Sequence, residues 1–266
     1  MKQEKAIIDV LESGVWGTIG PHSLSFGKAL AEYTGGRYAL VCHSADAAYE
    51  AALRSFGARL AALPHGDITV TGAFGAPRNS LIARCVGSEP LFVSCEESGA
   101  IDADLLQRVL SDAEKPVRAV TLDYLAEYGN TDAFPLARIS EVCRANGVPL
   151  ILNADGCIGV RHGDQPLTAF ADAVVYSFGE GSAIDVGMGG AVVCDAIEVC
   201  NGAFAYHNCG RGFDAGCSLE MGAIVGGDLR VTEWVAVAAE EALREGELTE
   251  PKRRVLAEMQ GQPVFG

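Results

Sequence analysis

The sequence predicts an α/β fold built on a mainly parallel, seven-stranded sheet, and three observations predict it. Short apolar runs rich in β-branched residues alternate along the chain with segments of helical periodicity. Most of these runs are continuously apolar, which is typical of strands covered by helices on both faces. The length of 266 residues and the hydrophobic content of 49% suffice for one large core, since single cores grow to roughly 250–300 residues.

The elements follow in order from the same patterns. Strands are expected at residues 38–42, 68–71, 91–95, 118–122, 150–153, 173–178 and 190–194. Helices are expected at 47–56, 102–110 and 135–145, and Asp102 suits the N-cap of the second. After residue 194 the strand pattern stops, and a last helix is expected at 231–245. We therefore expect one domain, residues 1–266, with an N-terminal segment 1–35, a sheet core 36–195 and a helical C-terminal part 196–266.

Charge and composition exclude several classes of function. Lys and Arg number 20 against 35 Asp and Glu, and the resulting net charge of -15 repels nucleic acids and anionic membrane surfaces. No apolar stretch reaches the roughly 18–20 residues of a membrane span, and the N-terminus lacks the apolar core of a signal peptide. We therefore expect a cytoplasmic protein whose partners include neither nucleic acid nor membrane.

Metal and redox chemistry have no support in the spacing of possible ligands. The nine cysteines never occur as Cys-x-x-Cys, so reduced cysteines and no metal are expected. The five histidines are not paired as metal ligands would be, and surface or loop positions are expected for them. They are His22, His43, His65, His162 and His207.

Two further motifs are incomplete. Residues 71–75, Thr-Gly-Ala-Phe-Gly, follow a strand but lack the third glycine of a dinucleotide-binding loop. Residues 216–219, Gly-Cys-Ser-Leu, are followed by Glu220 where a serine hydrolase requires glycine.

The most informative stretch lies between residues 150 and 194. One strand leads into Asn-Ala-Asp, ending at Asp155, and a second leads into Ser177 and Phe178. Residues 179–182 then read Gly-Glu-Gly-Ser, and residues 187–190 read Gly-Met-Gly-Gly. This block resembles the DegT/DnrJ/StrS family of pyridoxal-phosphate sugar aminotransferases. In that family a strand-end Asp pairs with the pyridine nitrogen, and Ser-Phe-x-x-x-Lys-x-x-x-x-Gly-x-Gly-Gly carries the Schiff-base lysine.

Further segments resemble the same family in the same order. Residues 44–48, Ser-Ala-Asp-Ala-Ala, resemble its Ser-Gly-Thr-x-Ala phosphate turn, and Phe74 stands where its ring-stacking aromatic is expected. Residues 227–233 are similar to its Gly-x-Asn-x-Arg-Met-x-Glu motif. The resemblance covers most of the chain and implies the large domain of the aspartate-aminotransferase type. It also implies that the C-terminal small domain is truncated.

The resemblance assigns a set of residues to a pyridoxal phosphate (PLP) or pyridoxamine phosphate (PMP) site. They are Ser44, Ala45, Asp46, Phe74, Asp155 and Ser177. Four of these have structural alternatives: Ser44 as a helix N-cap, Phe74 as a core residue, Asp155 as the cap of a turn, and Ser177 as a strand-end hydroxyl.

The sequence departs from the family pattern at three positions. Ser182 stands at the lysine position, and a hydroxyl forms no Schiff base and is no unassisted base near neutral pH. Asp46 replaces a threonine, and Asp228 replaces the asparagine that reaches the neighbouring subunit's phosphate. Each carboxylate at about 4 Å from a phosphate would cost roughly 1 kcal/mol in water and about 4 kcal/mol at an effective dielectric near 20.

These departures leave three hypotheses about function. The first is a non-catalytic family member that pairs with itself or with a full-length active aminotransferase. The second is a PLP- or PMP-dependent aminotransferase or dehydratase that needs no lysine and acts on a nucleotide sugar or related keto substrate, with Glu180 or Asp185 as its base. The third is an aminotransferase whose lysine comes from a partner chain.

Overall fold

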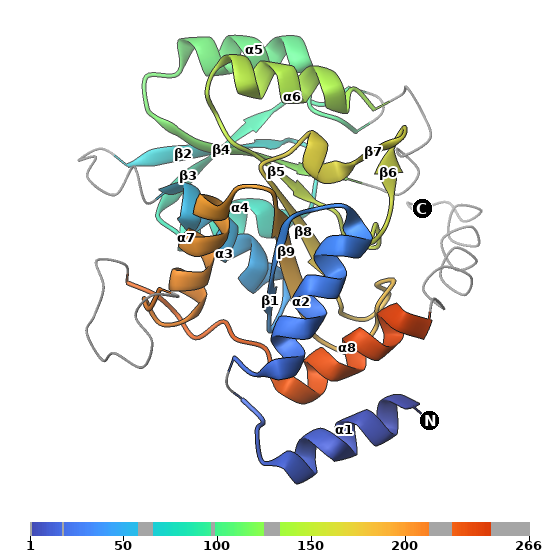
Figure 1. The fold of residues 1–266 in the computed structure, drawn as a ribbon. Helices are drawn as coiled ribbons and strands as arrows, with labels where there is room; N and C mark the ends of the chain where they lie inside the picture. Colours follow the sequence, from blue (N-terminus) through green and yellow to red (C-terminus); the bar gives the residue numbers. More distant parts are fainter. Residues whose placement is uncertain are drawn as a thin grey trace, which may run out of the picture.

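The computed structural model describes residues 2–17, 19–57, 66–96, 99–124, 134–212 and 225–245. Within them the chain forms a seven-stranded sheet with helices on both faces, and a separate two-stranded hairpin (Figure 1). His65, residues 216–220 and residues 246–266, which the sequence analysis considered, lie outside the described residues. The strands of the large sheet are β1 (Tyr38–Cys42), β2 (Asp67–Gly72), β3 (Ser88–Val93), β4 (Val117–Asp123), β5 (Leu150–Asn153), β8 (Ala173–Ser177) and β9 (Gly190–Cys194).

The predicted mainly parallel sheet is confirmed. Its strand order is β1-β9-β8-β5-β4-β2-β3. The four neighbouring pairs from β8 to β3 are parallel, whereas β9 runs antiparallel to both β1 and β8. As a consequence, the carboxyl ends of β2, β4, β5 and β8 meet at the edge where β9 begins. The hairpin of β6 (Arg161–His162) and β7 (Gln165–Pro166) is followed by the short helix η2 (Leu167–Ala169).

The bounds of β1, β5 and β9 agree with the sequence prediction, but the bounds of β3 do not. The strand begins at Ser88, three residues before the predicted start, directly after Gly87 turns the chain with φ +80°. It is an edge strand in which Glu89 and Phe92 are exposed and the buried hydroxyl of Ser88 pairs with Thr69, so its first residues, Ser-Glu-Pro, lack the apolar signal of a buried strand. Cys95, predicted to lie in the strand, instead forms an isolated bridge with Ile101.

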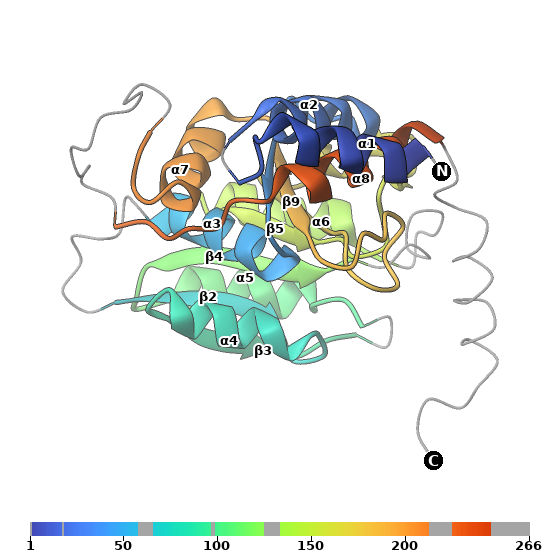
Figure 2. The same cartoon turned by 90° about the horizontal axis from the view of Figure 1, so that it is seen from below.

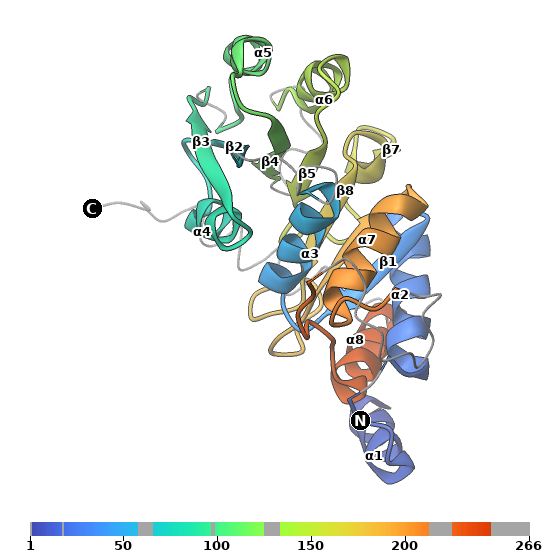
Figure 3. The ribbon, with the colours of Figure 1, turned by 90° about the vertical axis from the view of Figure 1, so that its left-hand side faces the viewer.

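Two layers of helices enclose the sheet. The helices are α1 (Lys2–Ser13), α2 (Pro21–Thr34), α3 (Ala45–Gly57), α4 (Pro77–Cys85), α5 (Ala103–Asp112), α6 (Leu136–Ala145), α7 (Ile197–His207) and α8 (Glu233–Glu245). The side chains of β5 show the two layers by alternation: Leu150 and Leu152 belong to the hydrophobic cluster that includes α2, α5, α6 and α8, whereas Ile151 belongs to the cluster that includes α3, α4 and α7. In Figure 3, α5 and α6 lie side by side at one end of the molecule and α1 lies at the other.

Four helices, α1, α2, α4 and α7, lie outside the ranges predicted at 47–56, 102–110, 135–145 and 231–245. The periodicity did not indicate α1, α4 and α7, because α1 is strongly charged, α4 is short, and α7 is apolar and rich in small residues, without a clear polar face.

Asp102 caps α5 as predicted, because its Oδ1 accepts N–H groups from Asp104 and Leu105, each at 2.9 Å. The prediction that the histidines lie at the surface or in loops is wrong for His207. This residue is buried on α7, because the helix packs against α3 and β1.

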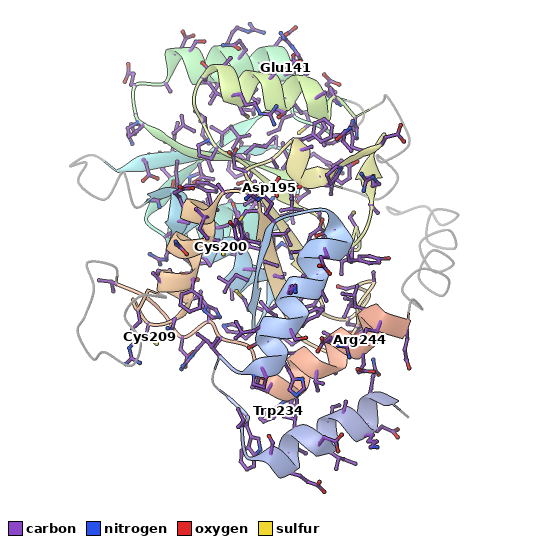
Figure 4. All side chains as sticks on the ribbon, in the orientation of Figure 1. Glu141, Asp195, Cys200, Cys209, Trp234 and Arg244 are labelled. Carbon is purple, nitrogen blue, oxygen red and sulfur yellow. The ribbon has the colours of Figure 1, made fainter. Side chains whose placement is uncertain are left out.

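Both ends of the described chain meet in one group of helices, α1, α2 and α8 (Figures 1 and 2). Glu233, the first residue of α8, is fully buried and accepts N–H groups from Gly20, His22 and Ser23 at 3.3, 2.8 and 3.2 Å. These amides belong to the first turn of α2, where backbone N–H groups have no partner within the helix. Figure 4 shows Trp234 next in the same turn, on the side of α8 that faces α1, and Arg244 at the other end of α8.

The described residues can be searched for membrane-spanning helices, metal sites and disulfides. Across the described ranges, no helix has the length and apolarity needed to cross a membrane. In the same part of the chain, no cluster of three or more His, Cys, Asp or Glu side chains is arranged to hold a metal ion. The described cysteines, which exclude Cys217, all have free thiols.

Candidate functional site

A pocket of about 400 Å³ lies at the carboxyl ends of β2, β4 and β5. Ligands of α/β sheets bind at this edge, outside the carboxyl ends of the strands. The volume is within the usual range of roughly 300–1,000 Å³ for small-molecule sites. The lining residues are Ala73, Phe74, Gly75, Ala76, Arg78, Gly99, Asp123, Tyr124, Asn153 and Asp155.

A hydrogen-bonded chain of three polar side chains joins two residues that line this pocket, Asp123 and Asn153. Asp123, which ends β4, accepts N–H groups from Ala76 at 2.6 Å and from Asn79 Nδ2 at 3.1 Å. Asn79 Oδ1 in turn accepts an N–H from Asn153 Nδ2 at 2.5 Å. An ionised carboxylate only accepts hydrogen bonds, so Asp123 fixes the orientation of Asn79, and Asn79 fixes that of Asn153. Asn153 is only 2% exposed, and its Oδ1 is left as a buried acceptor without a partner.

Arg78, on α4, supplies the positive charge of the pocket. Its Nη2 lies 2.6 Å from Asp155 Oδ2, and its Nη1 lies 3.7 Å from Asp46 Oδ1. Its Nε is buried and has no hydrogen-bond partner. Burial raises the pKa of Asp155 above its ordinary value, although the charge and the hydrogen bond of Arg78 act in the opposite direction. The arginine therefore connects the turn after β5 with the first turn of α3.

The turn at Ser44 and Ala45 contacts the start of β9. Ser44 Oγ accepts the N–H of Ala47 at 3.1 Å, so its role as the N-cap of α3 is present in the structure. A Cβ added to Gly190 would lie 2.5 Å from both the Cα and the N of Ala45, so only glycine lets the two backbones approach. Asp46 lies beyond this contact, with 60% of its side chain exposed.

The loop between β8 and β9 holds the remaining predicted residues. Ser177 Oγ accepts the N–H of Gly179 at 3.2 Å, which is its predicted role as a strand-end hydroxyl. Ser182 is buried, and its backbone N–H donates to Gly179 O at 3.0 Å. Asp185, an exposed residue, accepts N–H groups from Gly181 and Gly187 at 3.3 and 3.2 Å and so fixes the shape of the loop. Glu180 is exposed on its surface.

Two of the structural alternatives given for the predicted residues are wrong. Phe74 is not a core residue: it is 72% exposed at the mouth of the pocket, because residues 73–76 leave the sheet as a loop above Asp123. The carboxylate of Asp155 is engaged by a cation, Arg78, rather than serving as a simple turn cap. Asp155 also lies two residues beyond the end of β5, where Asn153 is the strand-end residue.

Asp228 lies apart from the pocket and has its own arginine. Its carboxylate accepts two N–H groups from Arg230, at 2.7 and 2.9 Å, and this interaction holds the pKa of Asp228 below its ordinary value. The backbone N–H of His43 donates to Leu229 O at 3.0 Å, which places this segment beside the end of β1. Asp46 and Asp228, which the sequence presents as unpaired charges, therefore each have an arginine partner.

Sequence reasoning missed three residues that line the pocket, Arg78, Asp123 and Asn153, and Asn79, which links two of them. Asp123 and Asn153 carried a usable signal, since each is a polar residue that ends an otherwise apolar strand pattern. No sequence pattern indicated Arg78 or Asn79, because both lie on the short helix α4, which the periodicity did not predict.

Comparison with known proteins identifies relatives of the chain. The sequence model of the DegT/DnrJ/EryC1/StrS aminotransferase family matches residues 1–263. The chain is similar to the UDP-4-amino-4,6-dideoxy-N-acetyl-beta-L-altrosamine transaminase of Helicobacter pylori, with 28% identity over 198 residues, 74% of this chain and 50% of the relative. It is also similar to the 3-amino-5-hydroxybenzoate synthase of Amycolatopsis mediterranei, with 26% identity over 238 residues, 88% of this chain and 58% of the relative. The chain thus spans about half the length of the curated relatives it matches.

Solved structures share the fold. The apo-form of the putative sugar aminotransferase Spr1654 from Streptococcus pneumoniae superimposes with a TM-score of 0.78 at 19% identity, covering 97% of this chain and 67% of that one. The Helicobacter pylori aminotransferase PseC, involved in the biosynthesis of pseudoaminic acid, gives a TM-score of 0.75 at 20% identity, with coverages of 92% and 63%. At these identities the similarity establishes the α/β aminotransferase fold.

Proposed function

The chain belongs to the DegT/DnrJ/EryC1/StrS aminotransferase family, and we propose that it is a non-catalytic member that acts as a subunit. Its partner is a second copy or a full-length active relative. The observation that carries this proposal is the position of Arg78, whose guanidinium engages Asp155 at 2.6 Å and approaches Asp46 at 3.7 Å.

The residues present do not suit pyridoxal phosphate. Asp155, assigned to the pyridine nitrogen, already binds a cation of this chain, so a pyridinium N–H would have to displace Arg78. In the turn assigned to the phosphate, Ser44 Oγ is used by α3, and Asp46 adds a negative charge. Backbone amides at a helix N-terminus favour a phosphate, but a carboxylate at about 4 Å opposes it by roughly 1–4 kcal/mol.

Ser182 supports the same proposal. It occupies the lysine position of the family block, is 6% exposed, and lies in a loop already organised by Asp185. Glu180, considered as a replacement base, is on the exposed side of that loop. We therefore derive no catalytic step from these residues.

A role as a subunit is supported by the surface around the site. Phe74 and Met188 are 72% and 63% exposed, and both belong to loops at the sheet edge where β2 ends and β9 begins. Exposed apolar surface on one edge of a sheet supports an interface there. The family resemblance implies dimerisation across this site, so the same edge would face the partner.

Calorimetric titration with PLP and with PMP tests the loss of the cofactor. We expect no binding heat with the unmodified chain. Micromolar binding of either form, about 8 kcal/mol, would overturn the proposal, and binding of PMP alone would favour the lysine-independent enzyme. The Asp46→Thr variant serves as the site control, because a retained phosphate site must bind more tightly once that carboxylate is removed.

Two further measurements test the remaining parts of the proposal. Ser182→Lys should leave transamination at background, and robust turnover by this variant would show an otherwise intact active site. After co-expression with a full-length family member, size-exclusion chromatography with light scattering should detect either a heterodimer of the two chains or a homodimer of this chain. A monomer under both conditions would contradict the subunit role.

A further inference from the structure

Helix α1 has two faces that carry apolar side chains, and within the described residues only one of them is covered. The first face packs against α8, where Gln3 Nε2 donates to Ala238 O at 3.2 Å and Val10 is 2% exposed. Ile8 and Leu11 lie on the other face and are 52% and 47% exposed. Figures 1 and 3 show α1 at the outer end of the molecule, beside α8. The second face is therefore open to a partner.

The open surface is larger than these two side chains. Ile8 and Leu11 are three positions apart and so are neighbours on the helix surface. Val15 and Trp16, directly after the helix, are 43% and 50% exposed. Trp16 Nε1 donates to Leu11 O at 3.0 Å, which places the indole at the C-terminal end of α1. These four residues form what we call the outer face of α1, and adjoining exposed apolar side chains indicate an interaction surface where single ones do not.

Two charged residues specify the partner of the outer face. Lys5 and Glu12 are both exposed, and their separation of seven positions, about two turns, places them on one side of α1, next to Ile8. A second α1 in parallel would set Lys5 against Lys5 and Glu12 against Glu12. An antiparallel α1 instead sets each Lys5 against the Glu12 of the other copy, twice in one interface. The outer face is thus complementary in charge to itself, in the antiparallel direction.

We propose that the outer face of α1 is a dimerisation surface that binds the same face of a second copy, with the two helices antiparallel across a two-fold axis. Ile8 of each copy packs against Leu11 of the other, and Lys5 of each pairs with Glu12 of the other. Because the same patch serves both copies, the contact closes at two chains. The inference goes beyond the proposed function, whose partner faces the sheet edge where β2 ends and β9 begins.

Sedimentation equilibrium of the unmodified chain at about 0.15 M salt measures this dimer. The net charge of -15 repels two copies at long range, and this salt limits the repulsion to about 8 Å. Leu11→Lys should weaken dimerisation at least about tenfold, because it removes two leucine contacts from one interface. Leu81→Lys, the same change at a 59% exposed position of α4, should not weaken it. A monomer at every concentration, or equal dimerisation of the two variants, would overturn the inference.

Exchange of the two charges tests the direction of pairing. Lys5→Glu should weaken dimerisation about threefold or more, because it sets two carboxylates against each other at both ends of the interface. Adding Glu12→Lys to this variant should restore the unmodified affinity, since both pairs are then reversed. Lys28→Glu, at an exposed position of α2, is the matched control for the first change. A double variant as weak as Lys5→Glu alone would rule out the antiparallel pairing.

Met188→Lys keeps the two proposals distinguishable. Met188 lies at the sheet edge that the proposed function assigns to the partner, and it is 63% exposed. A homodimer that Leu11→Lys weakens and Met188→Lys leaves intact supports pairing through α1, and the co-expression experiment then tests the functional partner separately. The opposite pattern supports the sheet edge and overturns the dimer through α1.

Discussion

Arg78 Nη2 lies 2.6 Å from Asp155 Oδ2, and this ion pair ties the first turn of α4 to the turn that follows β5. The two residues are 77 positions apart in the sequence, so the contact depends on β2, β4 and β5 being neighbours in the sheet. Burial is the largest single influence on the pKa of Asp155 and raises it, whereas the charge and the hydrogen bond of Arg78 lower it. The charge state of the pocket is therefore sensitive to Arg78.

Replacing Arg78 with methionine should raise the pKa of Asp155 further. The variant removes the charge and the hydrogen bond that lower this pKa, while burial and the nearby charges of Asp123 and Asp46 continue to raise it. A carbon-13 NMR titration of the Asp155 carboxyl measures the change directly. Arg230→Met is the matched control, because Arg230 pairs with Asp228 and should leave Asp155 unaffected. A pKa of Asp155 that stays constant in Arg78→Met would contradict the observed pairing.

Gly190→Ala should destabilise the protein by about 1–3 kcal/mol, the usual cost of inserting an atom into a packed region. The new Cβ would lie 2.5 Å from the backbone of Ala45, and a backbone cannot yield as a flexible side chain can. Urea unfolding measures the loss. Gly17→Ala is the control, since a Cβ there meets no atom within 4 Å. Equal stability of the two variants would show that the turn at Ser44 and β9 are not in contact.

The fold was largely predictable because buried parallel strands leave a strong apolar signal. The strands at 150–153 and 190–194 are interior strands of the sheet, and the edge strand at 38–42 is covered by α2 and α7. The bounds of all three agree with the prediction. The edge strand β3 was misplaced because its first residues are polar: Glu89 is exposed to solvent, and the buried hydroxyl of Ser88 is paired with that of Thr69. Sequence patterns report burial, and they fail where an element is exposed.

The candidate site was less predictable than the fold. Motif spacing located Ser44, Asp155 and Ser177 at one edge of the sheet, which the topology bears out. It gave no information on Arg78, because the partner of a long side chain depends on which strands are neighbours. For the same reason the carboxylates of Asp46 and Asp228 seemed unopposed in the sequence, whereas each lies near an arginine in the structure.

Glu233→Ala should lower the free energy of unfolding by about 2–3 kcal/mol, because three backbone N–H groups at the start of α2 lose an ionised acceptor. Glu233→Gln, which keeps one acceptor oxygen, should lose less. Chemical denaturation of both variants gives the two values. Glu12→Ala, on an exposed position of α1, should change the stability little. If Glu233→Ala were as stable as Glu12→Ala, α8 would not cap α2.

His207 should make the protein less stable as the pH falls from about 6.5 to about 4. Burial lowers the pKa of His207 to about 4, with further lowering from Arg230 and His43, whereas a hydrogen bond with the backbone of Val41 and the charge of Asp228 raise it. In this interval the unfolded chain binds a proton at the imidazole and the folded chain does not, so acid favours unfolding. The full interval corresponds to about 3 kcal/mol, at 1.36 kcal/mol for each pH unit.

The measurement is the free energy of unfolding in urea at pH 7.5, 5.5 and 4.5, for the unmodified chain and for His207→Phe. Phenylalanine keeps an aromatic ring beside Phe204, whose ring centroid lies 5.8 Å from that of His207, but it binds no proton. Because many carboxylates titrate in the same range, the informative quantity is the difference in slope between the two proteins. The unmodified chain should lose more stability with each unit of acidification, by the equivalent of up to one proton. Parallel slopes would mean that His207 titrates in the folded protein as it does in the unfolded one, and that its burial has no energetic consequence.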